Sequence, residues 1–345
     1  MTEIRPVGPA TLEDFVRLPQ RLHRRGTYNH TPASDRALLT GHHVLSGSLS
    51  TRGWVAYQHG QPVGRIGLTT YPGTPTGYVG FLEAPDGTRV APALFDAVRE
   101  AAPGQPLVGP MDASFWVRYR LKVAGFDEQP YLTEPLNPPH HVRLWERAGF
   151  AETDRYRSAI YHPAPPDLNL ARHEARLRRF QAQGYRVGPP RPGWQRLLRD
   201  MYGLISELYA DFPGFQPVPY AAFETLFDPL RLVTNLDLVT MAYRGERAEG
   251  FLVCLPDYGT GLADPGWLRR AAALVRTRLR PQRYVLAYLG VRQPGLGAAV
   301  SYRFMRQMSQ RQAVVVGALT HVGKASEGYA NQHLRTRNEY LLLQG

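Results

Sequence analysis

An internal repeat constrains the fold of this chain of 345 residues more than any other feature. An Ala-Tyr pair at positions 56 and 57 is followed by Gly64, and an Ala-Tyr pair at positions 242 and 243 is followed at the same interval by Gly250. The second copy lies 186 positions after the first (242 − 56). Around each copy, extended segments flank a turn, which predicts one β-hairpin over residues 54–70 and another over residues 238–255.

The elements around the two hairpins recur in one order. A short strand and a helix precede each hairpin, and a strand, an amphipathic helix and an apolar strand follow it. In the first half these elements are expected at residues 3–7, 12–22, 78–84, 91–101 and 106–111. In the second half they are expected at residues 185–187, 194–208, 284–291, 298–310 and 313–319. The sequence therefore predicts a duplicated domain of the α/β (α+β) class.

Two proline clusters mark the boundary between the copies, at residues 163–166 and 188–192. The segment between them has apolar residues at helical spacing, with Asp167 as a candidate N-cap and Gly184 as a candidate stop. We therefore expect an N-terminal domain over residues 1–164, a linker helix within residues 165–184 and a C-terminal domain over residues 185–345. The arginines of the linker helix are expected to be solvated: Arg172, Arg176, Arg178 and Arg179.

The charge balance names no partner by itself. The chain has 41 basic and 29 acidic residues, a net charge of +12, and its only lysines are Lys122 and Lys324. Abundant arginine beside 30 prolines and 33 glycines is explained at least as well by a GC-rich genome as by nucleic-acid binding. One cysteine, Cys254, excludes an intramolecular disulfide framework. No leader or membrane-spanning segment is recognisable, so a cytoplasmic protein without a membrane partner is expected.

The histidines could suggest a metal site, but their spacing does not support one. The candidates are His42, His43, His140, His141, His321 and His333. Adjacent histidines point in different directions, and none is paired at i, i+4 beside a carboxylate. Surface or capping roles and no metal are therefore expected. The cluster over residues 115–120 combines aromatic residues with arginines, which could stack on a nucleotide. Aromatics packed under a loop, with exposed arginines, are the favoured interpretation.

A glycine-containing loop follows the predicted strand over residues 284–291. Gly295 and Gly297 lie where this strand passes into a helix, so backbone amides and the positive end of the helix could hold a pyrophosphate. An ordinary strand-to-helix turn explains the same glycines equally well.

Residues 137–150 carry a family resemblance. An Asn that opens a helix ending in Glu-Arg-Ala-Gly-Phe resembles motif B of the GNAT superfamily of acyl-CoA-dependent N-acyltransferases. Residues 109–114, 125–127 and 137–139 are similar to a bacterial branch with two tandem GNAT-like domains. Residues 79–84 resemble the fourth strand of that branch, and residues 255–257 resemble the end of its second hairpin. With the internal repeat, the resemblance covers nearly the whole chain.

The resemblance implies a fold and a reaction. Each domain would be a mixed, mostly antiparallel sheet flanked by helices, in which the fourth and fifth strands splay into a V that admits acetyl-CoA or another acyl-CoA. A neutral amine, on a small molecule or a peptide, would attack the thioester with help from a general base, a backbone amide and a tyrosine that protonates the thiolate. The protein would be a monomer or a homodimer.

The second half matches the cofactor loop of the family, since residues 292–297 satisfy each position of its pattern. In the first half the equivalent loop begins with Asp86, which would repel phosphate, so that half is expected to have lost its cofactor. Its motif B has Trp145 at the usual tyrosine position. The resemblance implies cofactor contacts in the second half at Leu289, Gly290, Val291, Arg292, Gln293, Gly295, Leu296, Gly297, Ala298 and Ala299.

Catalytic and acceptor residues are less well defined. Tyr329 is the best-placed phenol of the second half and Tyr340 the next, while Glu249 and Asp257 are candidate bases or simply exposed carboxylates. The resemblance implies an acceptor pocket lined by Tyr209, Asp211, Phe212 and Phe215, and ordinary helix-to-loop packing is an equal alternative. Two other functions stay open: a GNAT-derived binding or scaffolding protein without activity and, more weakly, a basic protein that associates with nucleic acid.

Overall fold

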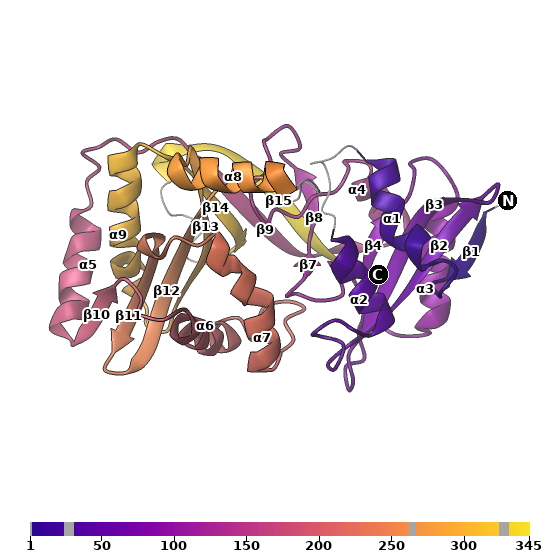
Figure 1. Ribbon diagram of the computed structural model, residues 1–345, viewed down its shortest axis with the longest axis horizontal. Coiled ribbons are helices and arrows are strands. Elements are labelled where there is room, and N and C mark those ends of the chain that lie inside the picture. Colours follow the sequence, from indigo (N-terminus) through magenta and orange to yellow (C-terminus); the bar gives the residue numbers. More distant parts are fainter. Residues whose placement is uncertain (1, 24–30, 262–266, 324–330) are drawn as a thin grey trace.

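The computed structural model describes residues 2–23, 31–261, 267–323 and 331–345 (Figure 1). The elements of the first half are β1 (Glu3–Pro6), α1 (Leu12–Leu22), α2 (Pro32–Thr40), β2 (Ser50–Gln58), β3 (Gln61–Thr70), β4 (Gly77–Glu83), α3 (Val90–Ala101), β5 (Leu107–Gly109), β6 (Met111–Asp112), β7 (Arg118–Tyr119), β8 (Leu121–Ala124), α4 (His141–Arg147) and β9 (Ala151–Tyr161).

The second half follows the same order from its first strand to its fifth, with an additional helix between its hairpin and its fourth strand. Its elements are α5 (Ala171–Ala182), β10 (Tyr185–Gly188), α6 (Trp194–Leu208), α7 (Tyr220–Phe227), the 3-10 turns η1 (Asp228–Leu232) and η2 (Leu236–Leu238), β11 (Val239–Arg244), β12 (Arg247–Pro256), α8 (Trp267–Leu279), β13 (Arg283–Val291), α9 (Leu296–Arg311), β14 (Val314–His321), the 3-10 turn η5 (Asn331–His333) and β15 (Leu334–Gln344). The predicted linker helix is α5, and the predicted helices over residues 12–22 and 194–208 have the observed bounds of α1 and α6.

One mixed, mostly antiparallel sheet runs through both halves. Its strand order is β1-β2-β3-β4-β5-β15-β9-β14-β13-β12-β11-β10, and β8 also pairs with β15. Read from either end, the order is the same once β1 to β5 are matched with β10 to β14. The two parallel pairs, β4 with β5 and β13 with β14, occupy matching places. The duplication seen in the sequence is therefore a pseudo-twofold symmetry of the sheet.

The two halves exchange their last strands at the centre of this sheet. Strand β9 ends the first half of the sequence but pairs with β14, where Tyr161 lies opposite Val315. Strand β15 ends the second half but pairs with β5, where Leu343 lies opposite Gly109. The C-terminus consequently lies within the first half (Figure 1). Because β9 and β15 also pair with each other along their lengths, each half contributes a strand that the other half needs.

The repeat extends to individual contacts. Both hairpins have a register shift directly after the alanine of the Ala-Tyr pair. The Tyr57 hydroxyl donates to the Asp14 carboxylate at 2.8 Å, and the Tyr243 hydroxyl donates to the Asp200 carboxylate at 2.7 Å. Both members of this pair are displaced by 186 positions, so the hydroxyl-carboxylate bond that joins the first helix to the hairpin was kept in both copies.

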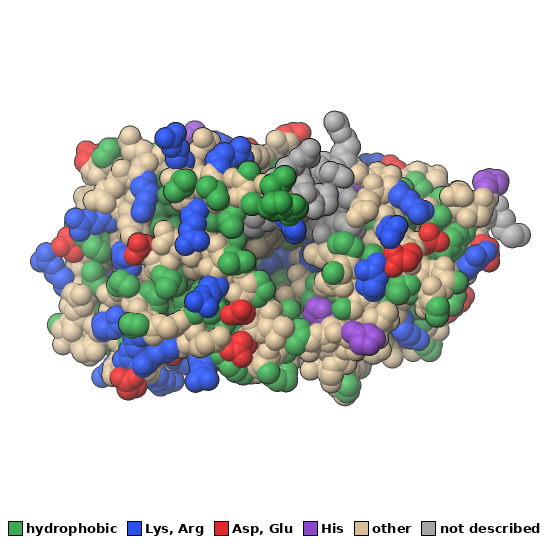
Figure 2. Space-filling view, viewed as in Figure 1, with side chains coloured by type: hydrophobic (Ala, Val, Ile, Leu, Met, Phe, Trp, Pro, Cys, Tyr) green, Lys and Arg blue, Asp and Glu red, His purple; other side chains and the backbone are tan. Residues whose placement is uncertain are grey.

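Helices cover both faces of the sheet. On one face, α1, α2, α6 and α7 share a single hydrophobic core that crosses from one half to the other. On the opposite face, α3 and α4 pack over the first half, and α5 and α9 pack over the second. Helix α8 is much more exposed, with Trp267 at 68% and Leu279 at 75% exposure, and Figure 2 shows apolar and arginine side chains at the surface there. No described helix is long and apolar enough to cross a membrane.

The strand exchange predicts that neither half folds alone. A fragment of residues 1–164 lacks β15, and a fragment of residues 185–345 lacks β9, so each would expose unpaired strand edges. We expect each fragment to aggregate or remain unfolded when expressed alone, and the two to form a 1:1 complex when co-expressed. Size-exclusion chromatography and circular dichroism measure both outcomes. A monomeric 1–164 fragment with cooperative unfolding would contradict the prediction.

Candidate acyl-CoA site

The strands β13 and β14 separate into a V in the second half. Their parallel pairing runs only from Arg283 opposite Val314 to Leu286 opposite Gly317. Beyond this point a cavity of about 700 Å³ opens between them. Its walls come from β13, β14 and α9, from α6 and α7, and from the loop over residues 115–120 of the first half.

The cavity walls are mainly apolar and aromatic. Helix α9 contributes Ala298, Phe304 and Met308. The aromatic residues that line the cavity are Phe115, Trp116, Tyr119, Tyr161, Tyr209, Phe212, Phe227, Tyr288 and Phe304. Tyr288 and Phe304, the side chains that could have closed the V, therefore form its walls and leave it open.

One edge of β13 leaves the parallel pairing with β14 after Leu286. Its other edge pairs with β12, where Gly290 lies opposite Phe251 and Val291 opposite Gly250. Past Leu286, no described strand pairs with the edge that faces β14. Leu289 lies in this stretch and lines the cavity. An unpaired strand edge offers backbone N–H and C=O groups to an extended ligand that contains amides.

The loop after β13 leads into the N-terminus of α9. Gly295 is the N-cap and has φ of 83°, a left-handed conformation that glycine adopts without strain. Gln293 and Gly295 are exposed, whereas Leu296, Gly297 and Ala299 are buried beneath the helix start. A Cβ on Gly295 would lie 3.6 Å from Nη1 of Arg176 on α5. An exposed arginine and the positive end of α9 therefore meet at this loop.

The Arg292 side chain points to other partners. Its guanidinium donates to both carboxylate oxygens of Glu207, at 2.8 and 2.6 Å, and to the Ala248 carbonyl. The hydrogen bond to Glu207 raises the pKa of Arg292. Arg292 thus fixes the loop to α6 and β12, and Arg176 is the guanidinium that lies beside Gly295.

Of the two predicted catalytic tyrosines, the structure describes only Tyr340, which does not line the cavity. Tyr329 is outside the described residues. Tyr340 is fully buried in the central strand pair, where its hydroxyl donates to Oε1 of Glu134 at 2.6 Å. Burial raises the pKa of Tyr340 well above its ordinary value, and the negative charge of Glu134 raises it further. The Tyr340 phenol is therefore a protonated member of a structural network.

Both predicted carboxylates are buried, so their interpretation as exposed groups is wrong. Glu249 is 5% exposed, and its carboxylate lies 3.5 Å from Nε of Arg247. Asp257 accepts hydrogen bonds at 2.8 Å from the backbone N–H of Leu132 and from that of Gly259, and it pairs with Arg283. Neither carboxylate lines the cavity. Asp257 instead joins the end of β12 to a loop of the first half.

The predicted acceptor residues divide into two groups. Tyr209 and Phe212 line the cavity, and the Tyr209 hydroxyl donates to the Leu289 carbonyl at 3.4 Å. Asp211 is exposed, and Phe215 packs behind the wall with its ring 5.3 Å from that of Trp116. The structure therefore brings together Tyr209, Phe212, Leu289 and Ala298, and it leaves the other described catalytic and acceptor candidates outside the cavity walls: Tyr340, Glu249, Asp257, Asp211 and Phe215.

The first half also contributes a guanidinium to the cavity, which the sequence did not predict. Arg120 lines the cavity, and its Cζ lies 3.7 Å from the ring centroid of Tyr119 and 4.0 Å from that of Tyr156. Its buried Nε has no acceptor, and among the described residues no carboxylate lies within ion-pair distance of it. The expectation of exposed arginines in residues 115–120 is wrong for Arg118 also, which pairs with Asp112. The alternation of aromatic and basic residues in this segment was the sequence pattern that could have indicated its place in the cavity wall.

The tyrosines around Arg120 are kept protonated. Burial raises the pKa of Tyr288 and of Tyr209, while the positive charge of Arg120 opposes this change. Near neutral pH both phenols can therefore donate a proton or a hydrogen bond.

His321 also lines the cavity, but its Nε2 lies 2.9 Å from Oδ1 of Asp154 and its Nδ1 lies 2.8 Å from the Val322 carbonyl.

The corresponding V in the first half is filled by its own chain. Beyond the short β4–β5 pairing, the Phe81 N–H donates to Oδ1 of Asp112 at 2.5 Å. A Cβ on Gly80 would overlap the Met111 carbonyl and lie 2.6 Å from Oδ1 of Asp112. The buried Trp145 ring lies against Gly109. The strand edge that is free in the second half is thus satisfied within the protein in the first.

Comparisons with known proteins agree with this architecture. No protein-family profile matches the sequence. A bacterial ceramide synthase of Caulobacter vibrioides is 25% identical over 270 residues, which cover 74% of this chain and 70% of that protein. Protein YghO of Escherichia coli is 25% identical over 228 residues, 61% of this chain and 56% of YghO.

Solved structures show the fold more fully. A tandem GNAT protein from the clavulanic acid biosynthesis pathway, solved without acetyl-CoA, matches 100% of this chain and 98% of its own with a TM-score of 0.53 at 12% identity. A GCN5-related N-acetyltransferase from Anabaena variabilis matches 99% of this chain and 72% of its own, with a TM-score of 0.51 at 9% identity. The chain therefore has the tandem GNAT fold, and the resemblance found in the sequence is confirmed at the level of fold.

Because the V of the first half is filled, an alanine at Gly80 should destabilise the protein much more than an alanine at a glycine with open space around it. Gly80→Ala forces a Cβ into the Met111 main chain, and we expect the free energy of unfolding to fall by about 2 to 3 kcal/mol. Gly188→Ala, on strand β10, is the control, because no atom lies within 4 Å of its added Cβ; it should change stability by less than about 0.5 kcal/mol. Urea unfolding measures both, and equal stability of the two variants would contradict a filled V.

Proposed function

We propose that the protein is an acyl-CoA-dependent N-acyltransferase whose second half binds the acyl-CoA. The observation that carries the proposal is the open V, where a cavity of about 700 Å³ lies beside the unpaired edge of β13. The tandem GNAT fold supports it, because acyl-CoA binds in the equivalent V of that superfamily. The filled V of the first half supports a single cofactor site per chain.

The cofactor would extend from the β13 edge to the start of α9. The amides of the pantetheine would pair with the backbone of β13 between Ala287 and Val291. The pyrophosphate would lie against the loop at Gly295, where the helix N-terminus and the Arg176 guanidinium provide positive charge. Only backbone contacts are proposed for Arg292, since Glu207 holds its side chain.

The chemistry of the walls favours an apolar group in the cavity. A volume of about 700 Å³ with aromatic walls is far larger than an acetyl group needs. The Caulobacter relative is a ceramide synthase, and a ceramide is the amide of a fatty acid with a long-chain amino alcohol. We therefore extend the expectation of acetyl-CoA to an acyl-CoA with a longer hydrocarbon chain, or to an acceptor amine that has one.

The reaction would be direct attack by the amine on the thioester. The carbon–nitrogen bond forms, the carbon–sulfur bond breaks, the nitrogen loses a proton and the thiolate gains one. We propose that Arg120 stabilises the negative charge that develops on the thioester oxygen, because its Nε is buried without an acceptor. We propose the protonated Tyr288 or Tyr209 as the hydrogen-bond donor to the thiolate.

Blocking the V should remove acyl-CoA binding. Ala298 lines the cavity at the first turn of α9, so the indole of an Ala298→Trp variant would fill the space between β13 and the start of α9 that we propose for the pantetheine. We expect calorimetric titration to give at least a tenfold lower affinity for acyl-CoA than the wild-type protein. The control is Ala182→Trp, at an exposed position near the end of α5. Absence of binding by the wild-type protein, or unchanged binding by Ala298→Trp, would contradict the proposal.

Affinity should also depend on acyl chain length. Each buried methylene contributes about 0.8 kcal/mol, so octanoyl-CoA should bind more tightly than acetyl-CoA until the cavity is full. Competition between the two thioesters, measured in the same titration, tests this. Equal affinities would exclude the apolar acyl site but would leave acyl-CoA binding intact. Binding of both thioesters without release of CoA in the presence of a range of amines would favour the inactive binding protein.

A further inference from the structure

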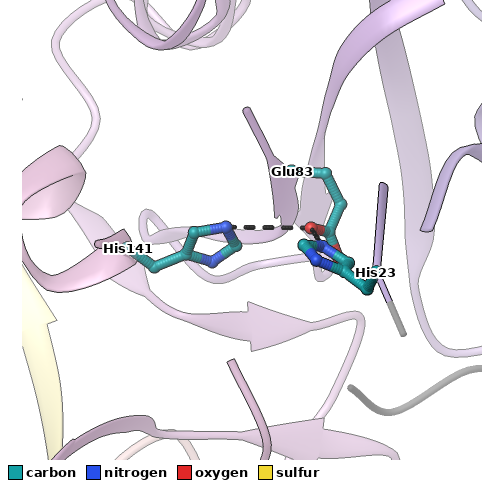
Figure 3. Close-up of side chains that lie close together, drawn as sticks. All are labelled: His23, Glu83 and His141. Carbon is teal, nitrogen blue, oxygen red and sulfur yellow. Dashed lines mark hydrogen bonds and ion pairs between the residues drawn. The ribbon is translucent and has the colours of Figure 1, made fainter. Parts of the chain in front are cut away.

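Two histidines and a glutamate lie close together in the first half of the chain, whereas the open V is formed by strands of the second half. His23 caps the end of α1, Glu83 is the last residue of β4, and His141 is the first residue of α4 (Figure 3). Nε2 of His23 lies 2.5 Å from Oε2 of Glu83, and Nε2 of His141 lies 3.7 Å from the same oxygen. One ligand atom from each of the three residues lies within 4.8 Å of the others.

One ring nitrogen of the third member lacks a hydrogen bond. The side chain of His141 is 4% exposed, and its buried Nε2 has no hydrogen-bond partner in the part of the chain that the structure describes. At 3.7 Å, the Glu83 carboxylate is beyond hydrogen-bond distance. Figure 3 shows this nitrogen pointing toward the carboxylate. Buried polar groups normally have a hydrogen-bond partner, so a buried nitrogen that is aimed at a carboxylate beyond hydrogen-bond distance needs an explanation.

The local structure sets the direction of His141. His140 places its Nε2 3.0 Å from the Ala84 carbonyl, which holds the start of α4 against the end of β4. The two adjacent rings are nearly perpendicular, at 87°, so His141 turns inward while His140 contacts the strand end. The expected surface or capping role is therefore wrong for His141, whereas His140 is half-buried and its side chain contacts the Ala84 carbonyl.

Among the described residues, the arginines whose charges act on the Glu83 carboxylate have aspartate partners. Arg65 is one of them, and it pairs with Asp35 at 3.1 Å. Arg118 also faces this region, and it pairs with Asp112. Each arginine is thus balanced by an aspartate, and the cluster keeps the single negative charge of Glu83.

We propose that His23, Glu83 and His141 bind a divalent transition-metal ion of the Zn²⁺ type. Zinc takes imidazole nitrogen and carboxylate oxygen ligands at about 2.0 to 2.2 Å, which puts ligand atoms about 3.3 Å apart in a tetrahedral site. The observed separations of 2.5 and 3.7 Å lie on either side of that value, so small side-chain shifts would admit the ion. The ion would replace the His23–Glu83 hydrogen bond and give His141 a partner.

Such an ion would have a structural role. It would join α1, β4 and α4, which are far apart in the sequence, within the half whose V is filled by its own chain. This site is separate from the proposed acyl-CoA site, so its test does not depend on acyltransferase activity.

Metal content of the full-length protein tests the proposal. After treatment with a chelator and dialysis against Zn²⁺, elemental analysis should find one zinc ion per chain in the wild-type protein. His141→Ala and Glu83→Gln should each retain less than a tenth of it, and His140→Ala, the matched neighbour, should retain all of it. Co²⁺ bound in place of Zn²⁺ should give visible absorption bands in the wild type and in His140→Ala only.

A second variant guards against loss of folding. His23→Gln alters the end of a surface helix, and circular dichroism checks that each variant keeps the wild-type fold. Folded His23→Gln should have lost the zinc and the Co²⁺ bands. The proposal is overturned if the loaded wild-type protein contains no zinc, or if folded His23→Gln or His141→Ala binds as much zinc as the wild type does.

Discussion

The antiparallel pairing of β9 with β15 is the contact on which the rest of the structure depends. Each of these strands completes the sheet of the opposite half, and a buried carboxylate fixes their position. Glu134 receives hydrogen bonds from Lys122, Asn338 and Tyr340 at 2.8, 2.9 and 2.6 Å, and two of these donors lie on β15. Lys122 compensates the charge of Glu134 within the first half, and the hydrogen bonds from Asn338 and Tyr340 tie this buried pair to β15, so the network resists separation of the halves.

This exchange explains how two copies of one fold can make a single site. Because the halves share a sheet, the loop over residues 115–120 of the first half can form a wall of the V in the second, and it brings Arg120 there. The first half has used its own V differently. Asp112 satisfies the Phe81 N–H that would otherwise face a ligand, and Gly80 allows the main chain to pass close by. Within one pseudo-symmetric sheet, the V of the first half is therefore filled and the V of the second half is open.

Local patterns in the sequence predicted much of the fold, because hairpins and amphipathic helices depend on neighbouring residues. The bounds of α1 and α6 and the equivalence of Tyr57 with Tyr243 are examples. The strand exchange could not be predicted, since the partner of β15 lies more than 200 positions away in β5. Several site residues were predicted incorrectly for the same reason, because their contacts join distant parts of the chain. Tyr340 lies in a segment where a catalytic tyrosine could be expected, but the register of its strand turns the side chain toward Glu134. No residue near His141 in the sequence indicates that Glu83 faces it.

The measurement that tests the account most directly is a crystal structure of the full chain grown with a saturating CoA thioester. The account predicts density for one CoA per chain, with the pantetheine between β13 and β14 and the pyrophosphate at the start of α9, and a first-half V still filled by Met111, Asp112 and Trp145. Density for CoA between β4 and β5, or a second-half V that stays empty at saturation, would contradict it.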